Sequence, residues 1–165
     1  HYKKSKKSKI EHFDFLAETG IDPRIKFIEN LLRDTKKEGD ILTYNKSFEV
    51  LRLKEIADVF PKYKKEIEDR INRVKDLMLP FQKKYFYTSK MQGSYSIKYV
   101  LPALVTDLSY ENLEINEGGL ASIAFESLYY ETDLMRIADI RDSLIEYCKM
   151  DTFAMVRLLE KLETL

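Results

Sequence analysis

The sequence predicts an α/β fold in which a sheet is flanked by helices. Residues 41–44 form an apolar, β-favouring run that ends in Asn45, a turn former, and a helix opens behind it. An earlier strand within residues 1–18 and a helix after Asp22 precede this run, and such an alternation favours a crossover onto a parallel sheet. Residues 144–162 add a long helical segment near the end of the chain.

The composition is that of one globular domain. A chain of 165 residues can bury a real core without disulfide bonds. Its 44% hydrophobic and 12% aromatic residues exclude intrinsic disorder. Because the net charge is zero although 34% of the residues are charged, no global field attracts nucleic acid, and any such binding must be local.

The cysteine count and the hydropathy indicate the cellular compartment of the protein. Cys148 is the single cysteine, which excludes an internal disulfide and suits a reducing compartment. The sequence shows neither an apolar run of membrane-spanning length nor a signal peptide. We therefore expect a cytoplasmic protein that makes no membrane contact.

The N-terminal residues predict a basic segment, a strand and then a helix. The lysines between Lys3 and Lys9 either contact phosphates or surround a solvated hairpin turn, and we favour the hairpin. His12 has no second histidine or cysteine at ligand spacing, so we expect it to be structural. The next helix begins at Asp22 and Pro23, and its packing face consists of Ile25, Ile28, Leu31 and Leu32.

Two helices are predicted to follow the strand at residues 41–44. The first continues to Phe60, where Pro61 interrupts it. The second spans about residues 64–79 and is expected to cover the sheet. Its inner face consists of Ile67, Ile71, Val74 and Met78.

Residues 81–100 are the most aromatic and basic stretch of the chain, and they allow two interpretations. Their aromatic side chains can stack on bases while their lysines contact phosphates, a combination used to bind single strands. Alternation over residues 85–87 equally fits a half-buried strand, and we favour core packing for most of the aromatics. The residues concerned are Tyr85, Phe86, Tyr87, Tyr95, Lys83, Lys84, Lys90 and Lys98.

The C-terminal third predicts turns and then helices. Pro102 ends or kinks its helix, and a short helical turn is expected over residues 109–113. The paired glycines after Glu117 lack a nucleotide-binding signature, so a tight turn is expected there. Asp133, with Thr132, caps the helix that begins at Leu134.

That helix places Tyr147 and Asp151 on one face, because they are four residues apart. A tyrosine hydroxyl beside a carboxylate can orient a water and bind a divalent metal, as metal-assisted phosphodiester hydrolysis requires. The same spacing equally gives a plain surface hydrogen bond. Cys148 has no histidine partner placed by any motif, so we expect no nucleophilic role for it.

A family resemblance favours the hydrolytic interpretation. Asn45, Phe48 and Glu49 match the pattern Asn-x-x-Phe-Asp with Glu at the last position, and Tyr147 with Asp151 matches Tyr-x-x-x-Asp. Together they resemble the 3′-5′ exonuclease superfamily of ribonuclease H-like fold. The runs YNKSFE, GSYSIKYVLPAL, EGGLAS and EYCKMDTFAMVRLLEKL more closely resemble a bacterial family, domain of unknown function 2779, placed in that superfamily.

The resemblance implies a nuclease with two Mg²⁺ or Mn²⁺ ions and a single strand or an end of DNA or RNA as substrate. Asp151 would ligate the ion that activates water, and Tyr147 would hydrogen-bond that water. Glu49 would hold the second ion and Asn45 would orient the turn. Ser96 and Lys98 resemble a Ser-Leu-Lys found near the substrate, although Ser96 equally suits a helix cap. The resemblance also includes an aspartate near the position of Asp76, which could therefore point toward the site.

One departure from the superfamily stands out. Its first motif, Asp-x-Glu on the opening strand, occurs nowhere in residues 1–165. We therefore expect a single, N-terminally truncated ribonuclease H-like domain over residues 1–165, with an incomplete metal site, the first strand lying upstream, and self-association through the gap. The alternative is a non-catalytic interaction or scaffold domain of the same fold.

Overall fold

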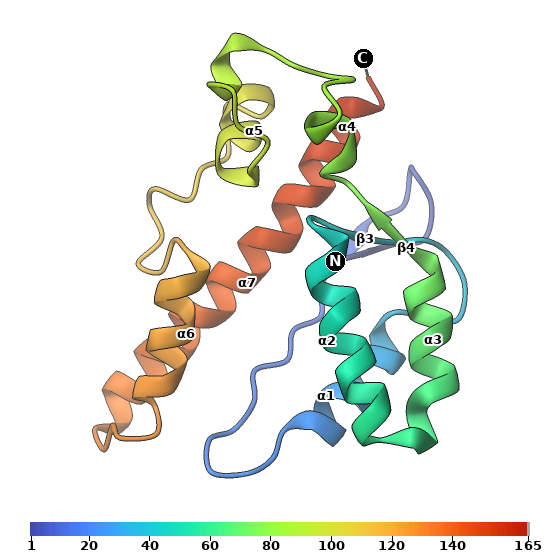
Figure 1. Cartoon of the computed structure of the whole chain (residues 1–165). Coiled ribbons are helices and arrows are strands. Elements are labelled where there is room, and N and C mark those ends of the chain that lie inside the picture. The colour runs from blue at the N-terminus through green and yellow to red at the C-terminus, as the bar shows by residue number, and fades with distance from the viewer. Residues whose placement is uncertain (165) are drawn as a thin grey trace.

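The computed structural model describes residues 1–164 and is organised around one long helix, α7 (Leu134–Leu162) (Figure 1). The N-terminal residues are tied along it. His1 Nδ1 lies 2.7 Å from Thr152 Oγ1, and the Lys3 ammonium pairs with Glu160 at 2.7 Å. Arg141, nearer the start of α7, donates to the carbonyl oxygens of residues 16 and 17. Helix α7 therefore holds the N-terminal residues against the C-terminal part of the chain.

The remaining elements are short. They are β1 (Tyr2–Lys3), β2 (Ile10–Glu11), α1 (Arg24–Asp34), β3 (Ile41–Thr43), α2 (Lys46–Val59), η1 (Pro61–Tyr63), α3 (Lys64–Arg73), β4 (Val74–Asp76), α4 (Leu79–Gln82), η2 (Ser89–Met91), α5 (Ile97–Leu104) and α6 (Gly118–Ser127). The fold class is thus mixed α/β, with many helices and small sheets. No helix within residues 1–164 combines the length and the apolar composition needed to cross a bilayer.

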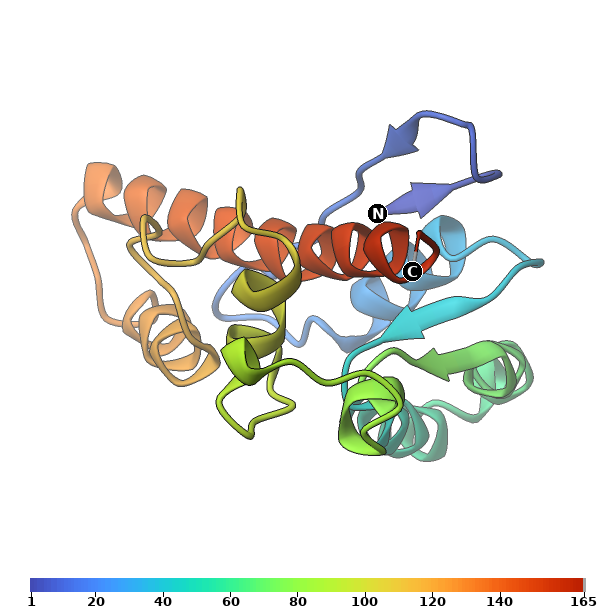
Figure 2. The same ribbon diagram turned by 90° about the horizontal axis from the view of Figure 1, so that it is seen from above.

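Two small sheets hold the strands. β1 and β2 pair antiparallel, so the lysine-rich segment does form a hairpin, as predicted. β3 and β4 pair in parallel, with Ile41 opposite Val74 and Thr43 opposite Asp76, and α2, η1 and α3 form the crossover. In the view of Figure 2 the hairpin lies on one side of α7 and β4 and α4 lie on the other.

Two predictions about these strands are wrong. The first strand of the chain does not join β3, because its hairpin partner satisfies it instead. The helix predicted over residues 64–79 ends at Arg73, since the backbone from Val74 onward pairs with β3. Val74 and Met78 continue a helical spacing, but strand pairing buries Val74 and overrides that local pattern.

The main core lies between α7, α5 and α4. Its fully buried members include Phe81, Met91 and Leu158. A second cluster joins α1, α2 and α3 through Ile28, Ala57 and Ile67, so the predicted packing role of α1 is confirmed at Ile28, whereas Ile25 is exposed. A third cluster joins α6 to the first half of α7. Burial of this kind stabilises a protein by about 25 cal/mol per Å² of apolar surface.

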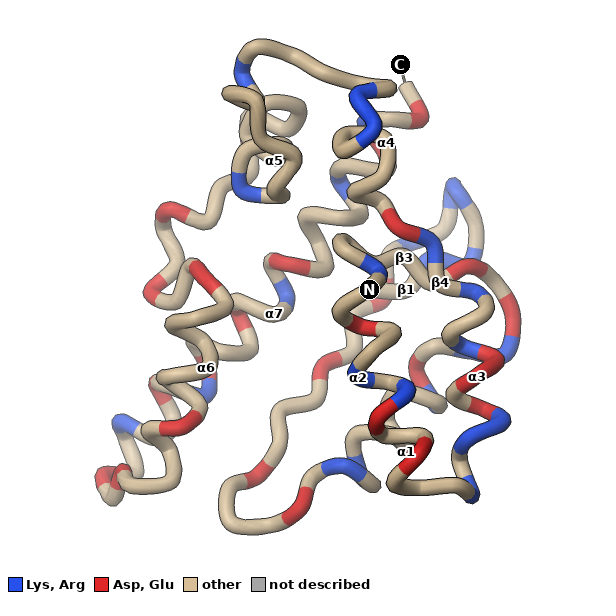
Figure 3. The backbone as a smooth tube through the Cα atoms, viewed as in Figure 1, with Lys and Arg blue, Asp and Glu red and all other residues tan. Residues whose placement is uncertain are grey.

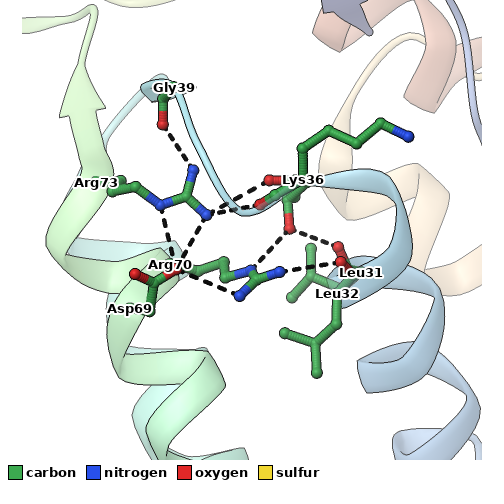
Figure 4. Close-up of polar contacts among 8 residues, drawn as sticks. Leu31, Leu32, Lys36, Gly39, Asp69, Arg70 and Arg73 are labelled. Carbon is green, nitrogen blue, oxygen red and sulfur yellow. Dashed lines mark hydrogen bonds and ion pairs between the residues drawn. The ribbon is translucent and has the colours of Figure 1, made fainter.

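Two arginines of α3 fix the loop that leads into β3 (Figure 4). Arg70, only 6% exposed, donates to the carbonyl of Leu32 at 3.0 Å. Arg73 donates to the carbonyls of Gly39 at 2.6 Å and Lys36 at 2.8 Å. Asp69 accepts from both guanidinium groups, which keeps their buried charge compensated. The loop therefore delivers β3 to a fixed place beside β4.

Some of the other local predictions are confirmed and some are not. Pro61 does interrupt α2, and Asp133 does cap α7 by accepting from Met135 N at 2.9 Å. The strand that residues 85–87 allowed is absent from the part of the chain that the structure describes. The helical turn predicted at residues 109–113 is present as a single hydrogen-bonded turn, in which Leu113 N donates to the carbonyl of Tyr110 at 3.0 Å. Pro102 lies inside α5, and Gly118 opens α6 rather than forming a turn.

Candidate functional site

Asp151 lies on α7 within a group of tyrosines. The hydroxyl of Tyr110 donates to Asp151 Oδ1 at 2.8 Å. Tyr110 is 8% exposed, and its ring centroid lies 6.4 Å from that of Tyr147, which sits one turn before Asp151 on the same helix. The predicted proximity of Tyr147 and Asp151 therefore belongs to a larger arrangement, in which a loop residue holds the carboxylate.

Burial controls the ionisation of this group. It raises the pKa of Asp151, while the hydroxyls of Tyr110 and Tyr147 and the charge of Lys98 act in the opposite direction. Burial and the neighbouring Asp151 charge raise the pKa of both tyrosines. Their hydroxyls consequently remain protonated at neutral pH and are available as hydrogen-bond donors.

Lys98 and Gly118 border the same group. Lys98, in the first turn of α5, pairs with Glu117 at 3.2 Å and lies close enough to Asp151 to lower its pKa. A methyl group on Gly118 would lie 3.7 Å from the Tyr147 hydroxyl, so the start of α6 approaches that hydroxyl closely. Ser96 is exposed at the N-cap position of α5, yet its side chain makes no capping hydrogen bond.

The other predicted site residues lie where β3 and β4 end. Asn45 occupies the N-cap of α2 with φ of 76°, a left-handed conformation that asparagine tolerates better than most residues. Asp76 accepts from Asn45 N at 3.1 Å, from Lys46 N at 3.0 Å and from Met78 N at 2.9 Å. Asp76 thus caps α2 and fixes this corner, which explains an aspartate here without a catalytic role.

Glu49 lies in the first turn of α2, as predicted. Its Oε2 is buried and has no hydrogen-bond partner within the described residues. Burial and the nearby charge of Asp76 raise the pKa of Glu49. A carboxylate in this state gains from a bound cation or from a proton.

Tyr44 links the residues around Asp151 with those at the ends of β3 and β4. Its hydroxyl donates to the carbonyl of Tyr95 at 2.7 Å, and its ring stacks on Phe81 with centroids 6.4 Å apart. The charge of Asp76 helps raise the pKa of Tyr44, and Tyr44 in turn helps raise that of Tyr110. Neither Tyr44 nor Tyr110 was among the residues predicted from the sequence to form the site. Tyr44 directly precedes Asn45, but no local pattern marks Tyr110, which reaches Asp151 across a loop.

The donor atoms present suit a hard divalent cation, because Asp151 and Glu49 both offer carboxylate oxygens. Among residues 1–164, however, no three His, Cys, Asp or Glu side chains gather where they could hold a metal ion. The described residues therefore do not fit a complete two-metal site, and no catalytic step through a metal follows from them.

Comparisons with known proteins identify a relative and a family for this chain. A relative from Ureaplasma parvum serovar 3 (strain ATCC 700970), described as the uncharacterized protein UU173, is 29% identical over 137 residues, which cover 72% of this chain and 20% of the relative. The chain thus spans about a fifth of the length of the curated relative it matches. No solved structure matches it. Residues 1–96, more than half of the chain, match the family described as Domain of unknown function (DUF2779). Of the resemblances in the sequence, the one to domain of unknown function 2779 is confirmed: the chain belongs to the DUF2779 family.

Proposed function

We propose that this chain is the greater part of a ribonuclease H-like domain that hydrolyses phosphodiester bonds at single strands or ends of nucleic acid. The observation that carries the proposal is the environment of Asp151. A partly buried acid with a raised pKa is held by one tyrosine, flanked by a second and placed near a lysine. Perturbed ionisable groups of this kind concentrate at functional sites.

Each residue then has a defined task. Tyr110 fixes the orientation of the Asp151 carboxylate through its hydrogen bond. Tyr147, kept protonated by its raised pKa, donates to a water or a substrate oxygen. Lys98 attracts a phosphate toward the start of α5, where Ser96 is exposed. Asn45 sets the turn from which Glu49 projects.

The proposal includes Mg²⁺ or Mn²⁺ as the ion that would supply Lewis-acid chemistry at Asp151 and Glu49. The two acids would not suffice by themselves, so the proposal requires further carboxylates in addition to those of residues 1–165. An Asp-x-Glu at the end of an upstream strand is the expected source.

The test uses this chain and the same chain extended upstream through that expected strand. Both are titrated with Mn²⁺ and assayed on labelled single-stranded DNA and RNA. The substitution Asp151→Asn keeps the shape and an acceptor for Tyr110 while removing the charge. Asp142→Asn is the matched control, because Asp142 is an exposed acid on the same helix.

Cleavage by the extended chain that Asp151→Asn abolishes and Asp142→Asn preserves would support the proposal. Tight Mn²⁺ binding by the extended form, weakened by Glu49→Gln, would support the metal assignment. If neither form binds Mn²⁺ and neither cleaves, the proposal fails and the alternative holds, a non-catalytic interaction or scaffold domain. An Asp151→Asn variant that cleaves at the normal rate would also reject it.

A further inference from the structure

The charges of this neutral protein are distributed unevenly. Residues 77–106 contain four lysines and no acid, between Asp76 at the end of β4 and Asp107 beyond α5. Figure 3 shows these lysines on the tube from α4 to α5. Like residues 1–10, this segment is basic and free of acids in a chain whose 28 basic and 28 acidic residues balance. It creates a local positive field where the protein as a whole has none.

The aromatic residues of this segment do not pack as the sequence analysis favoured. Phe86 alone turns inward, where it meets Phe81 edge-on with ring centroids 6.2 Å apart. Its neighbours point outward, with 78% of Tyr85 and 52% of Tyr87 exposed. Tyr95 and Tyr99 are 46% and 44% exposed. The core-packing interpretation is therefore wrong for Tyr85, Tyr87 and Tyr95, which with Tyr99 expose large rings to solvent in a segment that also carries the lysines.

The lysines are equally available. Lys83, Lys84 and Lys90 are exposed and make no ion pair with any residue in the described part of the chain. Lys98 pairs only with Glu117, at 3.2 Å. In the N-terminal hairpin, Lys3 and Lys6 are paired with glutamates of the C-terminal part of the chain, whereas Lys4, Lys7 and Lys9 make no ion pair within residues 1–164. Three of the four lysine charges of this segment are thus not neutralised by an ion pair within residues 1–164.

Buried residues hold the segment in place next to the candidate site. Met91 in η2 and Val100 and Leu101 in α5 are completely buried in the main core. The carbonyl of Tyr95 accepts from the hydroxyl of Tyr44, and Lys98 lies within electrostatic range of Asp151. The segment is therefore anchored by buried residues, and its C-terminal part, at Lys98, lies near Asp151.

We propose that residues 83–99 form a binding surface for single-stranded nucleic acid, with bases stacking on the exposed tyrosines and phosphates meeting the lysines. Tyrosine rings stack on bases only when these are unstacked from a duplex, so the surface selects single strands. Because Lys98 at one end of the surface lies near Asp151, the inference assigns the residues that bind the substrate of the proposed hydrolase and in that sense rests on it. Binding, however, is measurable without any cleavage.

The test measures binding of a fluorescent oligothymidylate of about 16 nucleotides by anisotropy, in EDTA so that no metal-dependent cleavage occurs. A salt series should give a slope of about −3 in log affinity against log salt, because each phosphate neutralised on a single strand contributes about −0.7. Replacing both Lys83 and Lys84 by alanine should roughly halve that slope. A duplex of the same length should bind at least tenfold more weakly.

Tyrosine variants separate stacking from charge. Tyr85→Ala and Tyr87→Ala should each weaken binding about tenfold and leave the salt slope unchanged, since stacking on an aromatic side chain is worth roughly 1–3 kcal/mol per base. Tyr130→Ala is the matched control. Tyr130 is 81% exposed but lies between Tyr129 and Glu131, away from the lysines, and its loss should not change binding. Because all these side chains are exposed, unchanged thermal unfolding confirms folded variants.

The outcomes distinguish this inference from the proposed function. Binding that depends on Tyr85 and on the lysines, without cleavage by the extended chain, would uphold the surface and reject the hydrolase. Cleavage that is insensitive to Tyr85→Ala and to the lysine substitutions would uphold the hydrolase and reject the surface. Equal binding of duplex, or tighter binding of an acidic polyglutamate peptide than of the oligonucleotide, would also overturn the inference.

Discussion

Asp76 and Asp151 are both partly buried carboxylates near the candidate site, yet their surroundings differ. Asp76 receives three backbone N–H groups, from Asn45, Lys46 and Met78. Asp151 receives a tyrosine hydroxyl, and burial raises its pKa. An acid satisfied by backbone donors holds the fold together, whereas an acid held by side chains at a cost in ionisation is typical of a functional position.

Glu49 resembles Asp151 rather than Asp76, although it lies on the helix that Asp76 caps. Its buried Oε2 has no partner among residues 1–164, and burial raises its pKa. Asp76 is therefore a structural acid, whereas Asp151 and Glu49 are acids whose ionisation the folded state disfavours. Four experiments test this separation.

The largest effect is expected from Asp76→Ala. The substitution leaves three N–H groups at the β3–α2 and β4–α4 junctions without their acceptor and should lower the free energy of unfolding by roughly 3 kcal/mol. The melting temperature should fall by roughly 6–12 °C. Asp58→Ala, on the exposed surface of α2, is the control and should change little. Equal losses in both variants would contradict a structural role for Asp76.

Asn45 tests the same corner through its backbone. Asn45→Ala should cost about 1–2 kcal/mol, because a β-carbon is disfavoured at a φ of 76°. Asn45→Gly loses the same hydrogen bond from Ser47 but tolerates the left-handed conformation, and so should cost about 0.5 kcal/mol at most. Urea unfolding of the pair measures the difference. Two equal values would show that the turn is not the constraint.

Tyr110→Phe removes only the hydroxyl that donates to Asp151. The pKa of Asp151 should rise further, because one of the interactions that lower it is lost. The expected loss of stability at neutral pH is about 1 kcal/mol. Titration of the aspartate carboxyl carbon by NMR reads the pKa, with Tyr99→Phe as an exposed control. An unchanged Asp151 pKa in the Tyr110 variant would rule out the assigned contact.

Asp151→Asn should slightly stabilise the protein at neutral pH, by about 0.5–1 kcal/mol. Folding favours the protonated acid, because the folded pKa lies above the ordinary value of 3.8. Any stability that Asp151 contributes is therefore present below that value and is lost as the pH rises through the raised folded pKa.

The gain from Asp151→Asn should consequently shrink as the pH falls toward 4, because the folded carboxyl is then protonated and the unfolded one becomes partly protonated. Glu49→Gln should behave alike, since its pKa is also raised. Thermal unfolding at neutral pH and at about pH 4 tests this. A loss of stability at neutral pH would place Asp151 and Glu49 with Asp76 as structural acids.

The sequence by itself determined the elements whose cause is local. The hairpin at the N-terminus, β3, the interruption of α2 at Pro61 and the cap at Asp133 all follow from turn formers, proline chemistry and apolar spacing within a few residues. For the same reason the placement of Tyr147 and Asp151 on one helix was predictable, because helical geometry relates residues four apart.

Only the tertiary structure decided what depends on distant partners. Strand β4 exists because residues 74–76 meet β3 across a crossover, against a helical spacing that continues to Met78. Tyr110 joins the site by reaching Asp151 across 41 positions of sequence. Tyr85 and Tyr87 face solvent because Phe86 takes the one inward place beside Phe81. Periodicity reports which residues share a face, whereas the partner that covers that face, or leaves it open, is set by packing between segments.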